Sequence, residues 1–305
     1  MVPEKSTSRI ALVTPVRDEA KFIGAMIESI AGQTVRPVKW IIVDDGSTDA
    51  TCEIVRGYAR RHEFITLIEL PPRGERQPGG ENAIRHGLHS LELGNYDFIA
   101  RFDADLQFEP DYLEQILAKF SADPTLGIAG GGLYIQENGR LRPENAPDYH
   151  VRGALKMYRT ECYRQIGGLR TSMGWDTIDE VFAWTKGWTT RSFFEHRVIH
   201  RRPTGEGIRA HRIYWERGKA EYSTWSHPVF VVLKTPKLAI GAAGPVAATC
   251  FLAGFVWANL RRLERLKDAA FVTARRGQQW KRMAAAIASR KASPLPLPVD
   301  VRSGQ

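Results

Sequence analysis

The sequence has few cysteines. Cys52, Cys162 and Cys250 are the three in 305 residues, and they lie roughly a hundred positions apart. This spacing excludes a disulfide framework and a zinc site built from paired cysteines, and it predicts buried thiols in a reducing compartment. Residues 1–9 contain no apolar run, so we expect no secretory signal and a chain that begins in the cytoplasm. Disorder of the whole chain is excluded too, because 43% of the residues are hydrophobic.

Charge of one sign is in excess only in the last quarter of the chain. Residues 1–230 hold 30 Lys and Arg against 31 Asp and Glu, whereas residues 231–305 hold 13 against 3. The net charge of +9 is therefore a property of the C-terminal region. A basic nucleic-acid-binding protein would carry its charge along the fold, so we expect no nucleic-acid partner.

Apolar runs and helical periodicities alternate in the first hundred residues. The run Ile10–Pro15 is typical of a buried strand, and apolar residues at helical spacing follow it. Strands are expected at 10–15, 40–43, 64–70, 97–102, 127–135 and 153–158, and helices at 18–31, 49–58, 81–93, 113–117, 160–166 and 179–186. Loops are expected at 71–80 and 137–149. The alternation predicts an α/β fold, with a mainly parallel sheet and helices on both faces.

Acidic residues follow three of these strands. They are Asp18-Glu19, Asp44-Asp45 and the pair Asp103 and Asp105. Ligands of such sheets bind at the carboxyl ends of the strands, so these carboxylates are expected to meet there. Asp103 and Asp105 have the spacing of two carboxylates that converge on Mg²⁺ or Mn²⁺, which takes further oxygens from a diphosphate. Taken alone, this pair is a weak signal, because Asp-x-Asp arises by chance in many chains and helix capping or a solvated turn accounts for it more often.

The three acidic segments together resemble a known family. Thr14-Pro-Val-Arg-Asp-Glu19, Val43-Asp-Asp-Gly-Ser-Thr-Asp49 and Phe102-Asp-Ala-Asp105 resemble the motifs of family 2 glycosyltransferases of the GT-A fold. The resemblance covers about residues 9–225. It implies a Rossmann-like α/β domain, a nucleotide-sugar donor, a divalent metal ion, and transfer with inversion at the anomeric carbon.

The resemblance also implies roles for single residues. Pro15, Glu19 and Asp45 would line the base and ribose of the donor, while Asp103 and Asp105 would bind the diphosphate and the metal ion.

Two departures from the family pattern introduce arginines. Arg17 stands in place of the usual Tyr of the first motif, and Arg85 lies in Ala83-Ile-Arg-His-Gly87, in place of the common Ala-Arg-Asn-x-Gly. A guanidinium at either position would contact the diphosphate, or it would lie on a solvated helix turn.

Inverting transfer needs a general base, which takes the proton of the acceptor hydroxyl. In the family an acidic residue about eleven positions before a Gly-Trp or Gly-Tyr has this role. Counting back from Gly187-Trp188 gives Asp176. Trp175 stands where the family has Glu, so Asp179 is the second candidate. Both Asp residues would also suit the start of a helix, where acidic side chains cap the backbone.

Trp215 lies in a segment that partly resembles membrane-embedded polysaccharide synthases. In His211-Arg-Ile-Tyr-Trp-Glu-Arg-Gly218 only the Trp and the Gly match their Gln-x-x-Arg-Trp region, in which the Trp lies at the acceptor terminus. Trp175 and Trp215 are therefore the candidate acceptor contacts, and a core position is the alternative for Trp215. His196 and His200 are nearby, and a His is an additional metal ligand in some GT-A enzymes.

The basic C-terminal region contains the longest uncharged run, residues 238–260. The run has the length of a membrane span, but Lys234, Lys237 and the basic residues after 260 flank it on both sides, and Pro245 would divide it. Beyond it, apolar residues from Val256 to Ala270 form a helical stripe opposite arginines. We expect residues 231–305 to bind anionic membrane lipids as a peripheral or re-entrant segment. The alternative is a helical subdomain that packs on the protein.

The sequence predicts two domains, a GT-A catalytic domain at 1–230 and a membrane-associated helical region at 231–305. The expected function is metal-dependent glycosyl transfer to a lipid-linked or polysaccharide acceptor at the cytoplasmic face of the cell membrane. The alternatives are a non-catalytic sugar-nucleotide-binding subunit and a nucleotidyltransferase. The second is disfavoured, because no Gly-rich phosphate loop with a Lys or Arg follows the first strand.

Overall fold

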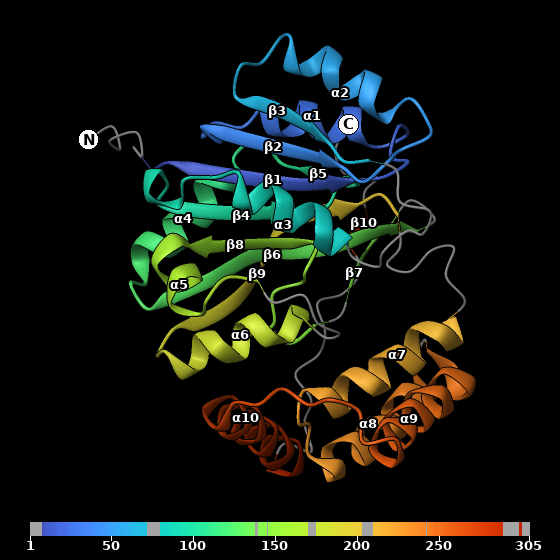
Figure 1. Ribbon diagram of the computed structural model, residues 1–305. Coiled ribbons are helices and arrows are strands. Elements are labelled where there is room, and N and C mark those ends of the chain that lie inside the picture. Colours follow the sequence, from blue (N-terminus) through green and yellow to red (C-terminus); the bar gives the residue numbers. More distant parts are fainter. Residues whose placement is uncertain are drawn as a thin grey trace. The chain divides into compact units, whose positions relative to one another are not determined.

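A computed structural model describes residues 8–71, 80–137, 140–144, 146–169, 175–202, 210–241, 243–288 and 299–300. The chain divides into two compact units (Figure 1). The sheet unit contains residues 1–169, 186–202 and 298–305, and the helical unit contains residues 170–185 and 203–297. The helices within residues 170–185 and after residue 203 therefore belong to the same unit as the C-terminal helices. The predicted boundary at residue 230, between a catalytic domain and a C-terminal region, stays a prediction.

The sheet unit is built on one mixed sheet. Its strands are β1 (Ile10–Val16), β2 (Lys39–Asp44), β3 (Ile65–Glu69), β4 (Phe98–Phe102), β5 (Leu106–Phe108), β6 (Leu126–Glu137), β7 (Arg140–Pro143), β8 (Leu155–Arg159), β9 (Thr189–His200) and β10 (Val299–Asp300). The strand order is β10-β7-β6-β8-β4-β1-β2-β3, and β9 pairs with both β5 and β6.

The expectation of a mainly parallel sheet is correct for the N-terminal half, whereas the second half is mixed: β6 pairs in parallel with β9, and the other pairs are antiparallel. β1, β2, β3 and β4 pair in parallel. From β4 onward, β8 pairs antiparallel with β4 and β6, and β7 pairs antiparallel with β6. β7 also lies within the segment 137–149 that was expected to be a loop. The pairing of these later strands is long-range, and no local pattern specifies it.

Helices cover both faces of the parallel strands, as expected. They are α1 (Ile23–Ala31), α2 (Thr51–Ala59), α3 (Glu81–His89), the short helix η2 (Leu93–Asn95), α4 (Tyr112–Ala122) and α5 (Thr160–Gln165). Ile10 and Leu12 of β1 join a core cluster with the apolar side of α1. The alternate residue Val13 meets Gly87 of α3, where an added Cβ would lie 2.6 Å from a Val13 methyl. Alternate side chains of β1 therefore point to opposite faces of the sheet, and a helix packs on each face.

Five helices lie in the described residues of the helical unit. They are α6 (Trp175–Thr185), α7 (Ala210–Ser223), α8 (Pro228–Ile240), α9 (Gly244–Leu260) and α10 (Ala269–Ala288). α7 and α9 cross at two glycines. An added Cβ would lie 2.0 Å from the Phe251 carbonyl oxygen at Gly218, and 2.3 Å from the Trp215 carbonyl oxygen at Gly254. Only glycine permits so close an approach of two backbones.

The uncharged run 238–260 divides as expected around Pro245, which occupies the first turn of α9. The single amphipathic helix expected over residues 256–270 is wrong, because α9 ends at Leu260 and α10 begins only at Ala269. Arg262, at φ +50°, lies in the segment between the two helices. In the part of the chain that the structure describes, no helix is both long enough and apolar enough to cross a membrane.

A buried carboxylate holds three helices of this unit together. Glu221 of α7 lies 2.6 Å from Nζ of Lys234 in α8 and 3.1 Å from Nη2 of Arg275 in α10. Burial raises the pKa of Glu221, but the two cations and the hydrogen bonds from Lys234 and Ser226 outweigh it and lower the pKa to about 2. Part of the basic charge of the C-terminal region is therefore neutralised inside the unit.

Candidate active site

The loops that follow β1 and β2 are tied together by acidic side chains. Asp18 adopts a left-handed conformation at φ +55°, and its amide donates to Ser47 Oγ at 2.9 Å. Its carboxylate accepts from the amide of Thr48 at 2.7 Å. Asp49 accepts from the amide of Ala20 at 3.1 Å. The motifs that the sequence shows as two separate segments thus form one interlocked turn structure.

Most polar side chains of the second motif form hydrogen bonds that hold the turn after β2. Asp44 accepts from the amides of Gly46 and Ser47, each at 3.0 Å, and so closes its own turn. Thr51 Oγ1 accepts from the amide of Glu19 at 2.8 Å. The hydroxyl and amide of Thr51 also donate to Asp49, and these bonds outweigh the effect of burial and lower the pKa of Asp49.

Asp45 differs from its neighbours. Its amide donates to the carbonyl oxygen of Val16 at 2.9 Å, so its position is fixed at the ends of β1 and β2. The side chain is buried, yet Oδ1 has no hydrogen-bond partner in the described part of the chain. Arg17 Nη1 lies 4.0 Å from Oδ2. A buried carboxylate oxygen without a partner is costly unless a ligand supplies one, so Asp45 is the member of the motif best placed to bind.

Pro15 lies beside the start of α3. An added Cβ at Gly80, which has φ +60°, would lie 2.8 Å from Pro15 Cβ. Arg85 is exposed on α3, and a contact of Arg85 with the diphosphate stays a prediction. Residues 72–79, most of the loop expected between β3 and α3, lie outside the described residues.

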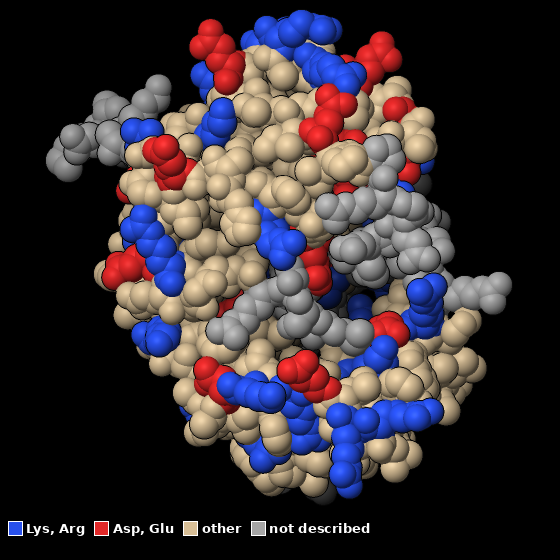
Figure 2. Space-filling model, viewed as in Figure 1, with Lys and Arg blue, Asp and Glu red and all other residues tan. Residues whose placement is uncertain are grey.

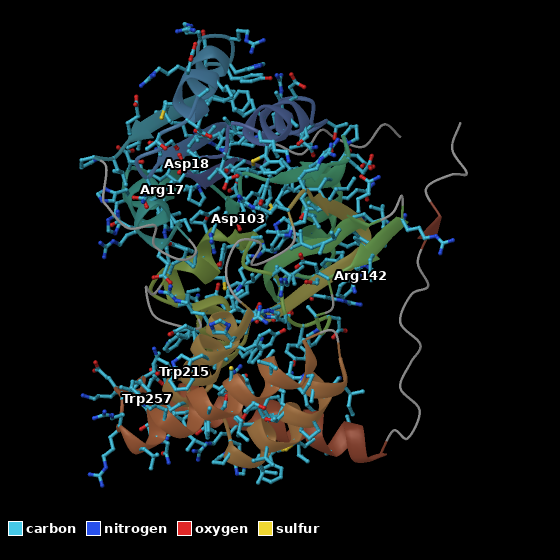
Figure 3. The ribbon with its side chains drawn as sticks, turned by 90° about the vertical axis from the view of Figure 1, so that its right-hand side faces the viewer. Arg17, Asp18, Asp103, Arg142, Trp215 and Trp257 are labelled. Carbon is cyan, nitrogen blue, oxygen red and sulfur yellow. The ribbon has the colours of Figure 1, made fainter. Side chains whose placement is uncertain are left out.

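Asp103 and Asp105 follow β4, as the sequence indicated. The amide of Asp103 donates to the carbonyl oxygen of Ala154 at 2.9 Å, and the amide of Arg201 donates to that of Asp105 at 2.9 Å. The two residues differ in burial: the Asp103 side chain is 36% exposed and that of Asp105 is 5% exposed. Asp103 after β4, and Arg17 and Asp18 after β1, can be located in Figure 3.

Asp105 is the centre of an ion-pair network that the sequence did not indicate. Arg202 Nη2 lies 3.0 Å from Asp105 Oδ2 and 2.5 Å from Glu19 Oε1. His200 Nε2 lies 3.4 Å from Asp105 Oδ1, while His200 Nδ1 lies 2.9 Å from Glu144 Oε1. Glu19 and Asp105, expected to bind different parts of the donor, are therefore brought together by one guanidinium.

The network shifts the pKa values of its members. Burial alone lowers the pKa of His200, but hydrogen bonds to Asp105 and Glu144 outweigh it and raise the pKa to about 9, so the imidazole is a cation at neutral pH. Burial raises the pKa of Asp105, and the hydrogen bond and charge of His200 with the charge of Arg202 outweigh it and lower that pKa. Asp105 is an anion with two cationic neighbours.

The other candidate residues belong to the helical unit. The side chains of Trp175 and Asp176 lie outside the described residues, although both positions are in the first turn of α6. Asp179 is buried in α6, and its Oδ1 accepts from the amide of Glu180 at 2.8 Å. Trp215 is half-buried, and its ring centroid lies 5.7 Å from that of Trp257 (Figure 3). The catalytic and acceptor roles of these residues stay predictions.

Sequence reasoning missed Arg202 and Glu144. Both come from segments far along the chain from their partners: Arg202 is 97 residues from Asp105 and 183 from Glu19. The one available signal was the pair of histidines on β9. Of these, His200 contacts Asp105, whereas His196 lies 4.0 Å from Glu195. Among the residues described, no cluster of three or more His, Cys, Asp or Glu has the arrangement of a metal site.

Known proteins are similar to this chain in sequence. The dodecaprenyl-phosphate galacturonate synthase of Rhizobium johnstonii is 27% identical over 52% of this chain and 49% of its own length. The poly-beta-1,6-N-acetyl-D-glucosamine synthase of Staphylococcus aureus is 24% identical over 65% of this chain and 46% of its own length. The chain thus spans about half the length of these curated relatives.

A solved structure is similar in fold. The mannosyltransferase PcManGT of Pyrobaculum calidifontis, in complex with GDP-Man and Mn²⁺, has a TM-score of 0.52 and 20% identity, and the match covers 95% of this chain and 77% of that one. The family model described as Glycosyl transferase family 2 matches residues 11–178, which include β1 to β8 and the acidic segments after β1, β2 and β4. The chain belongs to glycosyl transferase family 2 and is a glycosyltransferase with a GT-A-like α/β fold.

Proposed function

We propose that the chain transfers a sugar from a nucleotide-sugar donor to a lipid-linked or polysaccharide acceptor, with inversion at the anomeric carbon, at the cytoplasmic face of the cell membrane. Family membership supports the transfer itself. The Rhizobium relative, a dodecaprenyl-phosphate galacturonate synthase, supports a lipid-linked acceptor, and the GDP-Man complex of PcManGT supports a nucleotide-sugar donor. The observation that carries the proposal is the pairing of Glu19 with Asp105 through Arg202, together with the buried Asp45 that follows β2.

Asp45 is the proposed anchor for the nucleoside of the donor. Its buried Oδ1 needs a donor group, and a ribose hydroxyl or a base N–H would supply one. Pro15 would lie against the base, and Arg17, which already faces Asp45, would neutralise the phosphate next to the ribose.

A divalent metal ion fits the residue types of the site. Asp103 and Asp105 are two carboxylates at i and i+2, and Mg²⁺ or Mn²⁺ is commonly held by one or two carboxylates together with substrate phosphates. Asp103 and Asp105 would hold the ion, and Arg202 and His200, which already pair with Asp105, would compete with it for the carboxylate oxygens. The bound ion would stabilise the negative charge that develops on the leaving nucleotide.

The general base is proposed on α6. Asp176 or Asp179 would accept the proton of the acceptor hydroxyl as that oxygen attacks the anomeric carbon and the bond to the diphosphate breaks. Attack from the face opposite the leaving group inverts the configuration. Trp175 and Trp215 would offer flat apolar surfaces to the acceptor sugar.

A donor panel tests the proposal. Binding of UDP-, GDP- and dTDP-sugars to the full chain is measured by calorimetry with and without Mn²⁺, and the anomeric configuration of the product is read by NMR. We expect one nucleotide class to bind in a Mn²⁺-dependent way, and Asp45→Asn to weaken its binding. Arg85→Gln is a second variant, on the exposed side of α3. Weaker donor binding would indicate that Arg85 contacts the diphosphate, and unchanged binding would indicate a solvated position. Absence of binding to every donor, or retention of configuration, would overturn the proposal.

A further inference from the structure

The helical unit turns many apolar side chains outward. Among the described residues of the whole chain, ten large apolar side chains are exposed, and nine belong to this unit; the tenth is Val38 of the sheet unit. The nine are Val229, Val232, Leu233, Ile240, Val246, Val256, Trp257, Leu260 and Trp280. Single exposed apolar residues are normal, but nine in one small unit indicate a surface with a partner.

On α8 the exposed residues form one stripe. Val229, Val232, Leu233 and Ile240 have helical spacing and point to one side, and Ile240 is 89% exposed. Phe230 and Val231 on the other side are buried. α8 therefore has two apolar sides: one packs on the protein, and the other faces outward.

On α9 the same arrangement recurs. The helix has seventeen residues without a charge, and Val246, Val256, Trp257 and Leu260 are exposed along one side. Next to this side, one turn before Trp257, lies Gly254, whose contact with the Trp215 backbone leaves no room for a Cβ, and the ring centroid of Trp257 lies 5.7 Å from that of Trp215. Because this close contact with α7 fixes the rotation of α9, the helix cannot turn its exposed side inward without separating from α7.

The charged residues of α8 and the two that directly follow α9 are all cations. No acidic residue occurs between Glu221 and Glu264. The exposed Lys237 lies near the C-terminal end of α8, and the exposed Arg261 and Arg262 directly follow α9. Figure 2 shows Lys and Arg side chains over the C-terminal helices, with a few Asp and Glu side chains and uncharged surface between them. Apolar faces bordered by cations complement a layer that has acyl chains below anionic phosphates.

We propose that the outward sides of α8 and α9 insert into one leaflet of a membrane that contains anionic phospholipid, with Lys237, Arg261 and Arg262 at the level of the phosphates. One-sided exposure suits this position, because the other side of each helix packs on the protein. Trp257, at the cationic end of α9, has the amphipathic ring that is enriched at membrane interfaces. The inference rests on the proposed action at a membrane face and names the surface that makes the contact.

Co-sedimentation of the full chain with vesicles tests the proposal. The vesicles are phosphatidylcholine alone or phosphatidylcholine with phosphatidylglycerol. Three variants each remove one feature of the surface, and a fourth variant is the control. They are Val232→Gln/Leu233→Gln/Ile240→Gln on α8, Val246→Gln/Val256→Gln/Leu260→Gln on α9, Lys237→Gln/Arg261→Gln for the charge, and Val38→Gln as the control for an exposed valine elsewhere.

We expect the wild type and Val38→Gln to bind the vesicles that contain phosphatidylglycerol. Each apolar triple variant should bind about a hundredfold more weakly, because three side chains no longer enter the leaflet. Donor binding by calorimetry should be unchanged in every variant. Loss of binding in the charge variant together with full binding of both triple variants would overturn the proposal, since contact would then be electrostatic alone.

A second copy of the chain is the rival occupant of these surfaces. If the wild type is a dimer that does not bind vesicles, and the triple variants are monomers by light scattering, the proposal is wrong. Failure of the proposed function has a different signature: no nucleotide sugar would bind to any variant, whatever the vesicles show.

Discussion

Replacing Arg202 with methionine tests how the carboxylates of the site are neutralised. Arg202 is the cation shared by Glu19 and Asp105, whose side chains are each 5% exposed. Without it two buried anions remain, and His200 is the cation in contact with Asp105. Removing one partner of a buried ion pair typically costs 3–5 kcal/mol, and we expect about 3 kcal/mol because Arg202 is itself a quarter exposed.

That loss should be visible in thermal melts near neutral pH. For a unit of this size about 3 kcal/mol corresponds to a fall in Tm of about 6–12 °C. The matched control is Arg201→Met, because Arg201 is the exposed neighbour that donates to Gln107; its effect should stay within about 0.5 kcal/mol. Methionine keeps the apolar stem of the side chain, so the difference between the two variants reports the charge.

Addition of Mn²⁺ gives the decisive comparison. At the proposed metal site the ion would compete with Arg202 for Asp105 in the wild type, whereas in Arg202→Met the carboxylates would be open to it. Mn²⁺ at about a hundred times its dissociation constant should return about 2.7 kcal/mol to the variant. It should stabilise the wild type less. The reasoning is refuted if both proteins gain equally from Mn²⁺, or if Arg202→Met melts like the wild type.

Three further outcomes can be checked. Asp105→Ala should abolish Mn²⁺-dependent donor binding in calorimetry. Of Asp176→Asn and Asp179→Asn, the variant that removes the general base should keep donor binding and lose transfer. If both variants lose donor binding, the two residues of α6 have a structural role instead. Glu221→Gln should cost about 3 kcal/mol in urea unfolding. Because the pKa of Glu221 is lowered to about 2, its contribution is complete above pH 4.5 and declines toward pH 2, so the difference from wild type should be constant from pH 8 to 5 and shrink below. Gly254→Ala should destabilise the helical unit by at least about 1 kcal/mol, since its Cβ would meet a backbone carbonyl of α7; an unchanged melting curve would contradict that contact.

The parallel half of the fold was readable because its signals are local. Apolar runs that end in Pro15, Asp44 and Asp103 mark both the strands and the edge at which a ligand would bind. The alternation with helices then sets the parallel order through right-handed crossovers. The second half follows no such rule: β9 pairs with β6 in parallel and with β5 antiparallel, across long separations in sequence. Such pairing depends on the shape of the completed sheet.

The site shows the same division between local and long-range information. The motif residues were found from sequence, but their tasks were not. Asp44 and Asp49 hold turns, whereas Asp45 has a buried oxygen that no described residue of the chain bonds. Arg202 lacks a motif of its own: it is important because it lies two residues after β9, which ends at His200 beside Leu106, the residue after Asp105. A counter-ion is chosen by proximity in space, which a single sequence does not display.

The excess of basic residues in the last quarter of the chain also takes a different meaning in the folded helical unit. Lys234 and Arg275 neutralise the buried Glu221. The guanidinium of Arg265 lies 3.9 Å from the ring centroid of Tyr222 and 4.2 Å from that of Trp225, so it is committed to stacking. These three cations are used inside the unit. What faces outward on α8 and α9 is mainly apolar, so affinity for a membrane would come from burial of those faces, and the exposed cations at the helix ends would select anionic lipid.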